Sequence, residues 1–278
     1  MEARRQRDPA LTEVSGPRSV TASGPARPCI VLDHVSLRFQ SERREVLALS
    51  DISLTIADGE FVALRGPTGC GKSSLLRLVS DLLAPTAGTI AVRGEPAAAA
   101  RRLNQFGFVF QEPALLSWRT ALGNVQLPLE VVGYPHEKRI TRCEELLDSV
   151  GLLKFKDAYP HELSGGMKQR AAMVRALAWN PSILLMDEPF SALDELTRGQ
   201  LQDDLLQLWN RECKTILFVT HNISEAIYLA DRIVVMSAHP GRIKVVLRPD
   251  LPRPRTNDIH ETQEFMRWTR MAREALQS

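Results

Sequence analysis

A glycine-rich segment has the residue types and spacing of a phosphate-binding loop. Residues 66–73 are Gly-Pro-Thr-Gly-Cys-Gly-Lys-Ser, between an apolar run and a leucine-rich helical pattern, which fits the spacing G-x-x-x-x-G-K-[ST]. Glycines let backbone N–H groups turn toward phosphate oxygens, and the following helix adds the positive end of its dipole. We expect Lys72 to reach the β- and γ-phosphates of a nucleotide and the Ser73 hydroxyl to bind Mg²⁺.

An apolar run that ends in two carboxylates supplies the second half of such a site. Residues 183–188 are Ile-Leu-Leu-Met-Asp-Glu. We expect Asp187 to hold Mg²⁺, directly or through water, and Glu188 to orient or deprotonate the attacking water. By itself such a run is also typical of a solvated strand end, but its combination with the phosphate loop favours catalysis. Together the two segments predict a nucleoside triphosphatase.

Short β-rich runs alternate with helical patterns along the chain, and these elements must position the two segments. The β-rich runs cover residues 30–39, 61–65, 106–110, 183–186, 215–220 and 232–236. The last four are almost entirely apolar, as expected for strands buried on both faces of a sheet. Strands that alternate with helices predict an α/β fold with a largely parallel core sheet.

The sequence divides into a leader, a main domain and a C-terminal segment. Residues 1–28 are rich in Arg, Pro, Ser and Gly, so we expect a mobile leader, and they lack the apolar stretch of a secretory signal. Residues 29–248 form the predicted catalytic domain, with a mostly helical insertion at about 112–165. Residues 249–278 are predicted to be a Pro/Arg segment followed by a helix. We expect that helix to pack on the rest of the protein through an apolar stripe of its own, formed by Phe265, Trp268, Ala272 and Leu276.

Composition excludes several classes of protein. The 278 residues include 35 Lys and Arg against 33 Asp and Glu, a net charge of +2, which argues against a partner bound through a strongly basic surface, such as nucleic acid. The mean hydropathy is −0.15, and no apolar stretch is long enough to span a membrane. The spacing of Cys29, Cys70, Cys143 and Cys213 fits neither a zinc motif nor a disulfide framework.

A further motif precedes the acidic strand. Residues 163–170 are Leu-Ser-Gly-Gly-Met-Lys-Gln-Arg. At a helix start, Ser164 with Gly165 and Gly166 offers a hydroxyl and bare N–H groups to a second anion. In isolation this segment could be an ordinary helix cap. At this position, after the two motifs above, it resembles the signature of the ATP-binding cassette (ABC) ATPases.

The other elements of that family occur in order. Gln111 ends a predicted strand, as the Q-loop glutamine does, and residues 191–194 resemble the D-loop. His221 follows Val219-Thr220 like the switch histidine, and Phe39 stands where the family stacks an aromatic ring on adenine. The resemblance covers residues 30 to about 242. It implies a P-loop NTPase core with a mainly parallel sheet, an antiparallel β subdomain and an inserted helical subdomain.

The resemblance also implies a mechanism. Two copies of the chain pack head to tail, with ATP between the phosphate loop of one and the signature of the other. Ser164 and Gly166 then touch a γ-phosphate bound by the partner, and His221 contacts the γ-phosphate in its own chain. The implied catalytic residues are Glu188, His221 and Lys72, and the implied Mg²⁺ ligands are Ser73, Gln111 and Asp187. The implied ATP contacts are Phe39, Gly66, Pro67, Thr68, Gly69, Cys70, Gly71, Lys72, Ser73, Ser74, Gln111, Ser164, Gly165, Gly166 and Asp194.

A finer resemblance links the chain to the ATPases of bacterial nitrate, sulfonate and taurine importers. It rests on residues 111–120, 187–190, 196–198 and 236–243. It implies a separate integral membrane permease, indirect cooperation with a solute-binding protein, and a peripheral location at the cytoplasmic face of the inner membrane. Asn222 departs from the Asp that is frequent in the family, and residues 1–28 exceed the usual start, so the transported solute stays unassigned.

Two other functions are weighed here, and the positions of two side chains, Trp118 and Cys70, remain open. A soluble, non-transport ABC ATPase would need a second phosphate loop or a long coiled coil, which the sequence lacks, and a small-molecule phosphotransferase leaves the signature unexplained. Trp118, with Leu115 and Leu116, either receives a helix of the permease or is buried in the helical insertion. Cys70 either faces the nucleotide cleft, where the helix N-terminus favours a reactive thiolate, or turns into the core.

Overall fold

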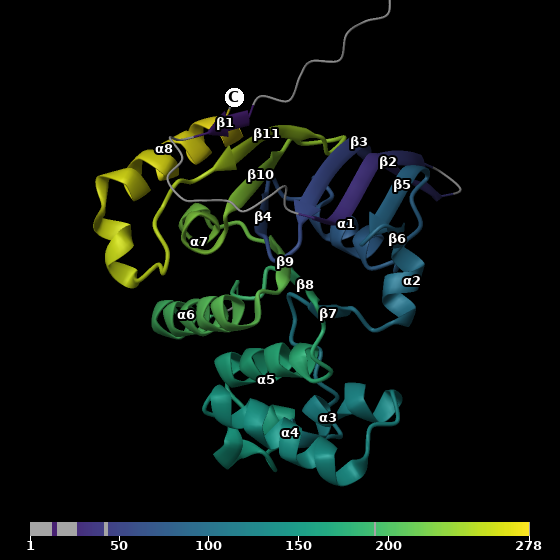
Figure 1. Cartoon of the computed structure of the whole chain (residues 1–278), viewed down its shortest axis with the longest axis vertical. Coiled ribbons are helices and arrows are strands. Elements are labelled where there is room, and N and C mark those ends of the chain that lie inside the picture. Colours follow the sequence, from purple (N-terminus) through teal and green to yellow (C-terminus); the bar gives the residue numbers. More distant parts are fainter. Residues whose placement is uncertain (1–12, 16–26, 42–43, 192, 278) are drawn as a thin grey trace, which may run out of the picture.

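The chain folds into two β-sheets with helices around them. The computed structural model describes residues 13–15, 27–41, 44–191 and 193–277 (Figure 1). Helices α3, α4 and α5 lie together at one end of the molecule, and the antiparallel sheet and helix α8 lie at the other (Figure 1). No helix among these residues is both long enough and apolar enough to cross a bilayer.

The larger sheet carries the residues predicted to do chemistry. Its strand order is β1-β11-β10-β4-β9-β8-β7. The strands are β1 (Glu13–Ser15), β4 (Phe61–Arg65), β7 (Phe106–Val109), β8 (Ile183–Asp187), β9 (Thr215–Val219), β10 (Arg232–Met236) and β11 (Ile243–Arg248). Strands β10, β4, β9, β8 and β7 run parallel, as predicted. Their carboxyl ends therefore share one edge of the sheet.

The far edge of this sheet differs from a plain parallel one. Strand β11 runs antiparallel to β10, and β1 pairs with β11 in parallel. Strand β1 belongs to the segment predicted to be a leader. The rest of that segment up to residue 26 lies outside the described residues, so its mobility stays a prediction.

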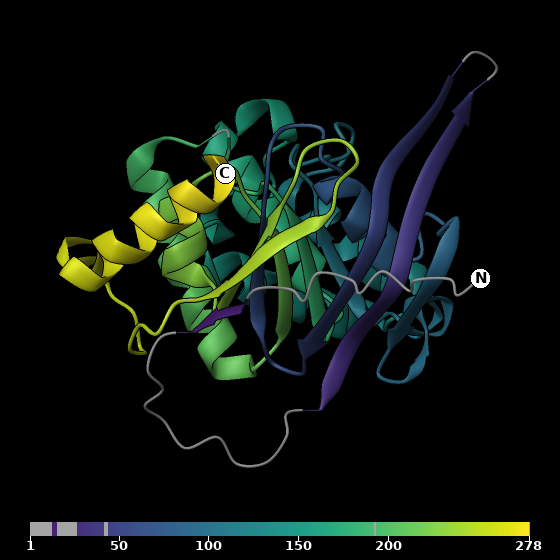
Figure 2. The same cartoon turned by 90° about the horizontal axis from the view of Figure 1, so that it is seen from above.

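The smaller sheet is antiparallel, with the order β3-β2-β5-β6. Its strands are β2 (Pro28–Ser41), β3 (Arg44–Ala57), β5 (Ala87–Val92) and β6 (Glu95–Pro96). Strands β2 and β3 form a long hairpin that projects from the body of the molecule (Figure 2). Only the first of the four strands was identified from the sequence, although the family resemblance implied the subdomain.

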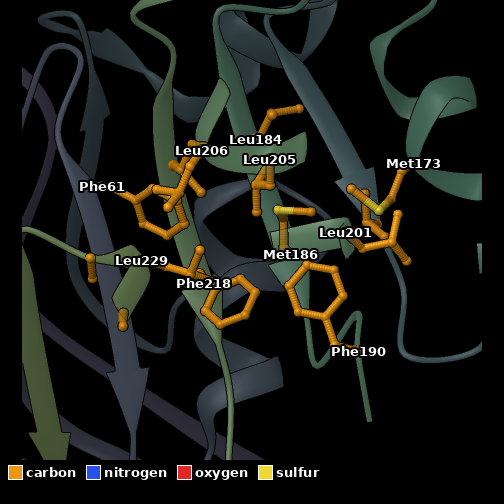
Figure 3. Close-up of a cluster of buried hydrophobic side chains, with 14 of the residues drawn as sticks. Phe61, Met173, Leu184, Met186, Phe190, Leu201, Leu205, Leu206, Phe218 and Leu229 are labelled. Carbon is orange, nitrogen blue, oxygen red and sulfur yellow. The ribbon is translucent and has the colours of Figure 1, made fainter. Parts of the chain in front are cut away.

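Alternation along the buried strands separates two hydrophobic cores. In β4, Phe61 and Ala63 face one core, while Val62 and Leu64 face the other. The first core contains side chains of the helices from α3 to α8, and Figure 3 shows its aromatic centre, where Phe218 packs against Phe61 and Phe190. The second core lies toward α1 (Lys72–Val79) and the antiparallel sheet. Burial on both faces explains why these strands are apolar at every position.

The predicted helical insertion is present. It contains α3 (Ala121–Val131) and α4 (His136–Ser149), with the break between them at Gly133-Tyr134-Pro135 as predicted. Helix α5 (Gly165–Leu177) begins where the insertion was expected to end, and it packs on both α3 and α4. The helical layer therefore continues through α5. Strand β8 follows α5 in the chain. The remaining helices of the catalytic domain are α2 (Ala97–Arg102), α6 (Glu195–Glu212) and α7 (Ile223–Leu229).

The C-terminal segment fastens onto α7 through a buried arginine. Helix α8 (Gln263–Gln277) buries Phe265 and Trp268 against the first core. Upstream of it, Arg255 donates hydrogen bonds to the carbonyls of Ile227 (3.0 Å), Tyr228 (3.0 Å) and Ala230 (2.8 Å). These are carbonyls at the C-terminus of α7, which the helix itself leaves unpaired. A fixed cation also complements the negative end of the helix dipole.

Removal of the Arg255 side chain is expected to destabilise the fold. Arg255→Ala leaves buried carbonyls without donors and opens a cavity, so we expect a loss of about 2–4 kcal/mol in the free energy of unfolding. For a chain of this size that corresponds to a fall in Tm on the order of 5–15 °C. The matched control is Arg270→Ala, which changes an exposed arginine of α8. Calorimetry that gives both variants the same Tm would contradict the capping role.

Candidate active site

The phosphate loop has the backbone geometry of an anion-binding cradle. Gly69 and Gly71 have φ values of +78° and +93°. At Gly71 a side chain is excluded by contact as well, because a Cβ there would lie 2.6 Å from Cδ2 of Leu49. Gly71 precedes α1 and provides no side-chain cap, so the first N–H groups of the helix stay available to a ligand. These features fit a phosphate group.

Lys72 lies inside this cradle. Its side chain is buried, and Nζ donates to the carbonyl oxygens of Gly66 (2.9 Å) and Pro67 (3.0 Å). The ammonium group is thus held by the loop itself rather than by a carboxylate. A cation that shares its cradle with backbone N–H groups suits the β- and γ-phosphates of a nucleotide.

Ser73 and Asp187 meet at the carboxyl edge of the sheet. The Ser73 hydroxyl donates to Oδ1 of Asp187 at 2.9 Å. Asp187 is buried, and burial raises the pKa of its carboxyl, opposed first by the Ser73 hydrogen bond and then by the charges of Arg77 and Lys72. A hydroxyl and a carboxylate side by side are the hard oxygen donors that Mg²⁺ prefers. The pair therefore fits the predicted metal, and Mg²⁺ would offset the cost of a buried negative charge.

Gln111 follows β7 at the same edge. Val109 of β7 pairs with Met186 of β8, which places the residues after β7 beside Asp187. In the described part of the chain no hydrogen bond joins Gln111 to Ser73 or Asp187. Gln111 is exposed, and its part in metal binding stays a prediction.

Glu188 and His221 face each other next to this pair. Nε2 of His221 lies 2.5 Å from Oε1 of Glu188. Glu188 has a φ of +49°, and its N–H donates to the carbonyl of Val219 at 3.0 Å. A non-glycine residue in the left-handed region is uncommon and is often found at functional sites. The geometry brings together a candidate general base and a candidate phosphate contact.

Phe39 lies on the projecting hairpin. Leu37, two residues earlier, pairs with Leu49, whose side chain covers Gly71. The pairing of β2 with β3 is irregular between Leu37 and Arg38. The ring of Phe39 is 44% exposed. An exposed ring can stack on a base, and the contact of Phe39 with adenine stays a prediction.

The signature segment and the D-loop each begin a helix. The hydroxyl of Ser164 accepts from the N–H of Met167 at 3.3 Å, and the carboxylate of Asp194 accepts from the N–H of Thr197 at 3.0 Å. A Cβ on Gly166 would lie 2.8 Å from Cγ2 of Thr197, so this glycine permits close packing of α5 on α6. Among the described residues no hydrogen bond or ion pair joins either segment to the phosphate loop. Within one chain the signature segment and the phosphate loop are thus separate.

Comparison with known proteins identifies the family. The sequence profile of the family described as ABC transporter matches residues 49–191. The chain is 42% identical to the nitrate import ATP-binding protein of Synechocystis sp., over 83% of this chain and 88% of that protein. It is 41% identical to the aliphatic sulfonates import ATP-binding protein of Bacillus cereus (85% and 92%) and 45% identical to the taurine import ATP-binding protein of Rhizobium johnstonii (79% and 83%).

Solved structures similar to this chain belong to the same family. An ATP-binding cassette whose dimeric post-hydrolysis state is bound to ADP and phosphate has a TM-score of 0.72 and 34% identity, with 79% of this chain and 98% of that chain covered. The cbiO1 protein of Clostridium perfringens, part of an ABC transporter complex, has a TM-score of 0.72 and 25% identity, with 90% and 98% covered. The chain belongs to the ATP-binding cassette (ABC) transporter ATPases. The predicted fold class, family and ATPase activity are confirmed.

Of the two placements left open for Cys70, the structure has the one in the core. Cys70 is 0% exposed, and a Cβ on Gly66 would lie 2.7 Å from its sulfur, so the thiol turns inward beneath the loop. Burial raises the pKa of the Cys70 thiol, and this outweighs the opposing charge of Lys72, whose Nζ is 3.8 Å from the sulfur. A contact between Cys70 and ATP stays a prediction.

The placement of Trp118 is settled in favour of the surface. Its side chain is 72% exposed, whereas Leu115 packs against the first core. The buried amide of Asn124 fixes the segment between them, because it accepts from the N–H of Leu116 (2.7 Å) and donates to the carbonyl of Leu116 (3.1 Å). A rigid segment of the cassette therefore presents an aromatic side chain to solvent.

Arg175 of α5 is a functional candidate that sequence reasoning missed. Its guanidinium donates to the carbonyls of Pro113 and Ala114, each at 2.7 Å. Ala114 has a φ of +46°, and burial lowers the pKa of Arg175. Arg175 thereby fastens the Q-loop to the helix that begins with the signature motif. No sequence signal distinguishes it from the other arginines of that helix.

Thiol reactivity tests the burial of Cys70 in the core. Of the four cysteines only Cys213 is exposed, and burial raises the pKa of Cys143 to about 11. We expect one thiol per native chain to react quickly with Ellman's reagent, and the other three only on unfolding. The Cys213→Ser control should remove the fast phase. Rapid labelling of Cys70 in that variant, blocked by Mg-ATP, would restore the cleft-facing alternative.

Proposed function

We propose that the chain is the ATP-hydrolysing subunit of an importer, which drives uptake of a small anion or organic solute through a separate membrane permease. The solute class follows the relatives named for nitrate, sulfonate and taurine import. A peripheral position at the cytoplasmic face of the inner membrane and indirect cooperation with a solute-binding protein belong to the same proposal. The observation that carries the catalytic part is the pairing of Ser73 with Asp187 beside Glu188 and His221.

Each residue of this edge has a distinct task. Lys72 and the N–H groups of residues 69–73 bind and orient the β- and γ-phosphates, while Phe39 stacks on the base. Ser73, Asp187 and Gln111 hold Mg²⁺, which would neutralise charge on the phosphate oxygens. Glu188 accepts the proton of the attacking water, and His221 stabilises the charge that develops on the γ-phosphate.

A second copy of the chain completes the site. Ser164 and Gly165 are exposed in the described structure, and the free N–H groups at the start of α5 form an anion site without a ligand in their own chain. The dimeric state of a structurally similar cassette supports the same arrangement. ATP would then join the phosphate loop of one chain to residues 164–166 of the other, so binding closes the dimer and hydrolysis releases it.

Trapping of the dimer tests the catalytic proposal. Glu188→Gln preserves size and hydrogen bonding but removes the base, so hydrolysis should fall by about 10²–10⁴-fold while ATP still binds. Because unhydrolysed ATP bridges two chains, we expect light scattering to show a shift from monomer to dimer with ATP and none with ADP.

Two further variants make this test specific. Ser164→Arg, added to Glu188→Gln, places a bulky side chain at the bridging contact and should abolish the dimer. Asp187→Asn should lose Mg²⁺-dependent nucleotide binding and never trap it. A Glu188→Gln dimer that ignores the nucleotide, or one that survives Ser164→Arg, would falsify the sandwich arrangement.

The exposed tryptophan tests the transport proposal. Trp118→Ala removes a large apolar side chain from the surface, so we expect weaker assembly with the proposed permease and an unchanged Kd for ATP. Leu103→Ala is the matched control, because Leu103 is also strongly exposed but lies beyond the opposite end of β7. Assembly is measured by co-purification with the permease from detergent. Full yield of the complex with the Trp118 variant would contradict a permease contact at Trp118.

A further inference from the structure

A buried hydrogen-bond chain lies beneath the turn that carries His221. The Thr220 hydroxyl donates to Oε2 of Glu225 at 2.5 Å and accepts from the N–H of Asn222 at 2.9 Å. Thr220 and Glu225 are both buried. A hydroxyl has one proton, so donation to the carboxylate leaves its lone pairs facing the N–H group. Glu225 therefore orients the hydroxyl that holds the residues on both sides of His221.

The same carboxylate reaches toward the D-loop. Oε1 of Glu225 lies 3.6 Å from Nε of Arg198, and Nη2 of Arg198 donates to the carbonyl of Leu193 at 2.7 Å. Leu193 directly precedes Asp194, which caps α6. Side chains of Thr220, Glu225 and Arg198, here called the Thr220–Arg198 link, thus join the His221 turn to the D-loop.

Helix capping does not explain this buried carboxylate. Asn222 and Glu225 have the spacing of a capping box, in which the glutamate would accept from the N–H of the cap residue. Here the Asn222 N–H is bound by Thr220 instead, and the Asn222 side chain already accepts from the N–H groups of Ser224 (2.9 Å) and Glu225 (3.3 Å). The carboxylate instead accepts from the Thr220 hydroxyl and faces Arg198, despite the cost of its burial.

The charges around the link point toward the catalytic pair. Burial raises the pKa of Glu225, opposed first by the Thr220 hydrogen bond and then by the charge of Arg198. Arg65, which ends β4 just before the phosphate loop, interacts electrostatically with Glu188 and with Glu225. Glu225 also interacts electrostatically with Glu188, so the link and the Glu188–His221 pair act on each other's charges.

We propose that Thr220, Glu225 and Arg198 are positioning residues that hold the imidazole of His221 against Glu188 and keep its turn in register with the D-loop. This inference rests on the proposed catalytic roles of His221 and Glu188. Small displacements of a catalytic group are costly, since about 1 Å can reduce a rate about 100-fold. The link should consequently affect turnover more than nucleotide binding, which uses the phosphate loop.

Substitution at Thr220 tests the proposal in the full chain. Thr220→Val keeps the side-chain shape but removes the hydroxyl, whereas Thr220→Ser retains it. We expect Thr220→Val to lower kcat about 10- to 100-fold, with KM and the Kd of a fluorescent ATP analogue changed less than about threefold, and Thr220→Ser to recover most of the kcat. Glu225→Gln should lower kcat as well, and the Thr220→Val/Glu225→Gln double variant should be no worse than the poorer single one.

Controls separate positioning from general damage. Thr269 of α8 also donates a hydrogen bond from its hydroxyl, in this case to the carbonyl of Phe265 at 2.9 Å. Because Thr269 lies outside the link, Thr269→Val should leave kcat unchanged. Wild-type kcat in both Thr220→Val and Glu225→Gln would overturn the proposal. So would a Thr220→Ser protein as defective as Thr220→Val, with the same loss of Tm. His221→Ala with normal turnover would instead overturn the role of His221 on which the inference rests.

Discussion

Ser73 and Asp187 are 114 positions apart, yet a 2.9 Å hydrogen bond joins them. The bond exists because β4 and β8 are both parallel neighbours of β9, so the phosphate loop and the acidic residues leave the sheet at the same edge. Glu188 and His221 meet for the same reason, since they follow β8 and β9. Strand register thus brings the candidate catalytic side chains to one edge of the sheet.

This arrangement puts polar groups at the end of a very apolar sheet, and burial dominates their electrostatics. The pKa values of Asp187, Glu225 and Cys70 are all raised, and in each case burial is the largest cause. For Asp187 and Glu225 a neighbouring hydroxyl opposes the effect, from Ser73 and Thr220 respectively. Two carboxylates buried at one sheet edge are therefore each stabilised by a hydroxyl from an adjacent strand end or helix.

The sequence allowed prediction of the features that depend on periodicity and spacing. Strands β4, β8, β9 and β10 were identifiable because burial on two faces requires continuous apolar runs. Strand β3 was missed, although its Ile52, Leu54 and Ile56 are buried and alternate with more exposed residues, as in a strand buried on one face. The inward turn of Cys70 and the bonds of Arg175 depend on rotamers and on tertiary neighbours, which spacing does not encode. The spacing of Asn222 and Glu225 is typical of a helix cap, and it does not predict the hydrogen bond that Glu225 accepts from Thr220.

Two partly buried arginines connect the sheet edge to the segments proposed to face a partner. Arg175 bonds the Q-loop from the helix that the signature motif begins, and Arg198 bonds the D-loop while it faces Glu225 under His221. Each arginine binds main-chain carbonyls, so each fixes the path of a loop and not merely one side chain. A displacement of α5 must then move the Q-loop, and a displacement of the D-loop must disturb the His221 turn. Hydrogen bonds within one chain therefore connect the phosphate-binding edge to the surfaces proposed to face a partner.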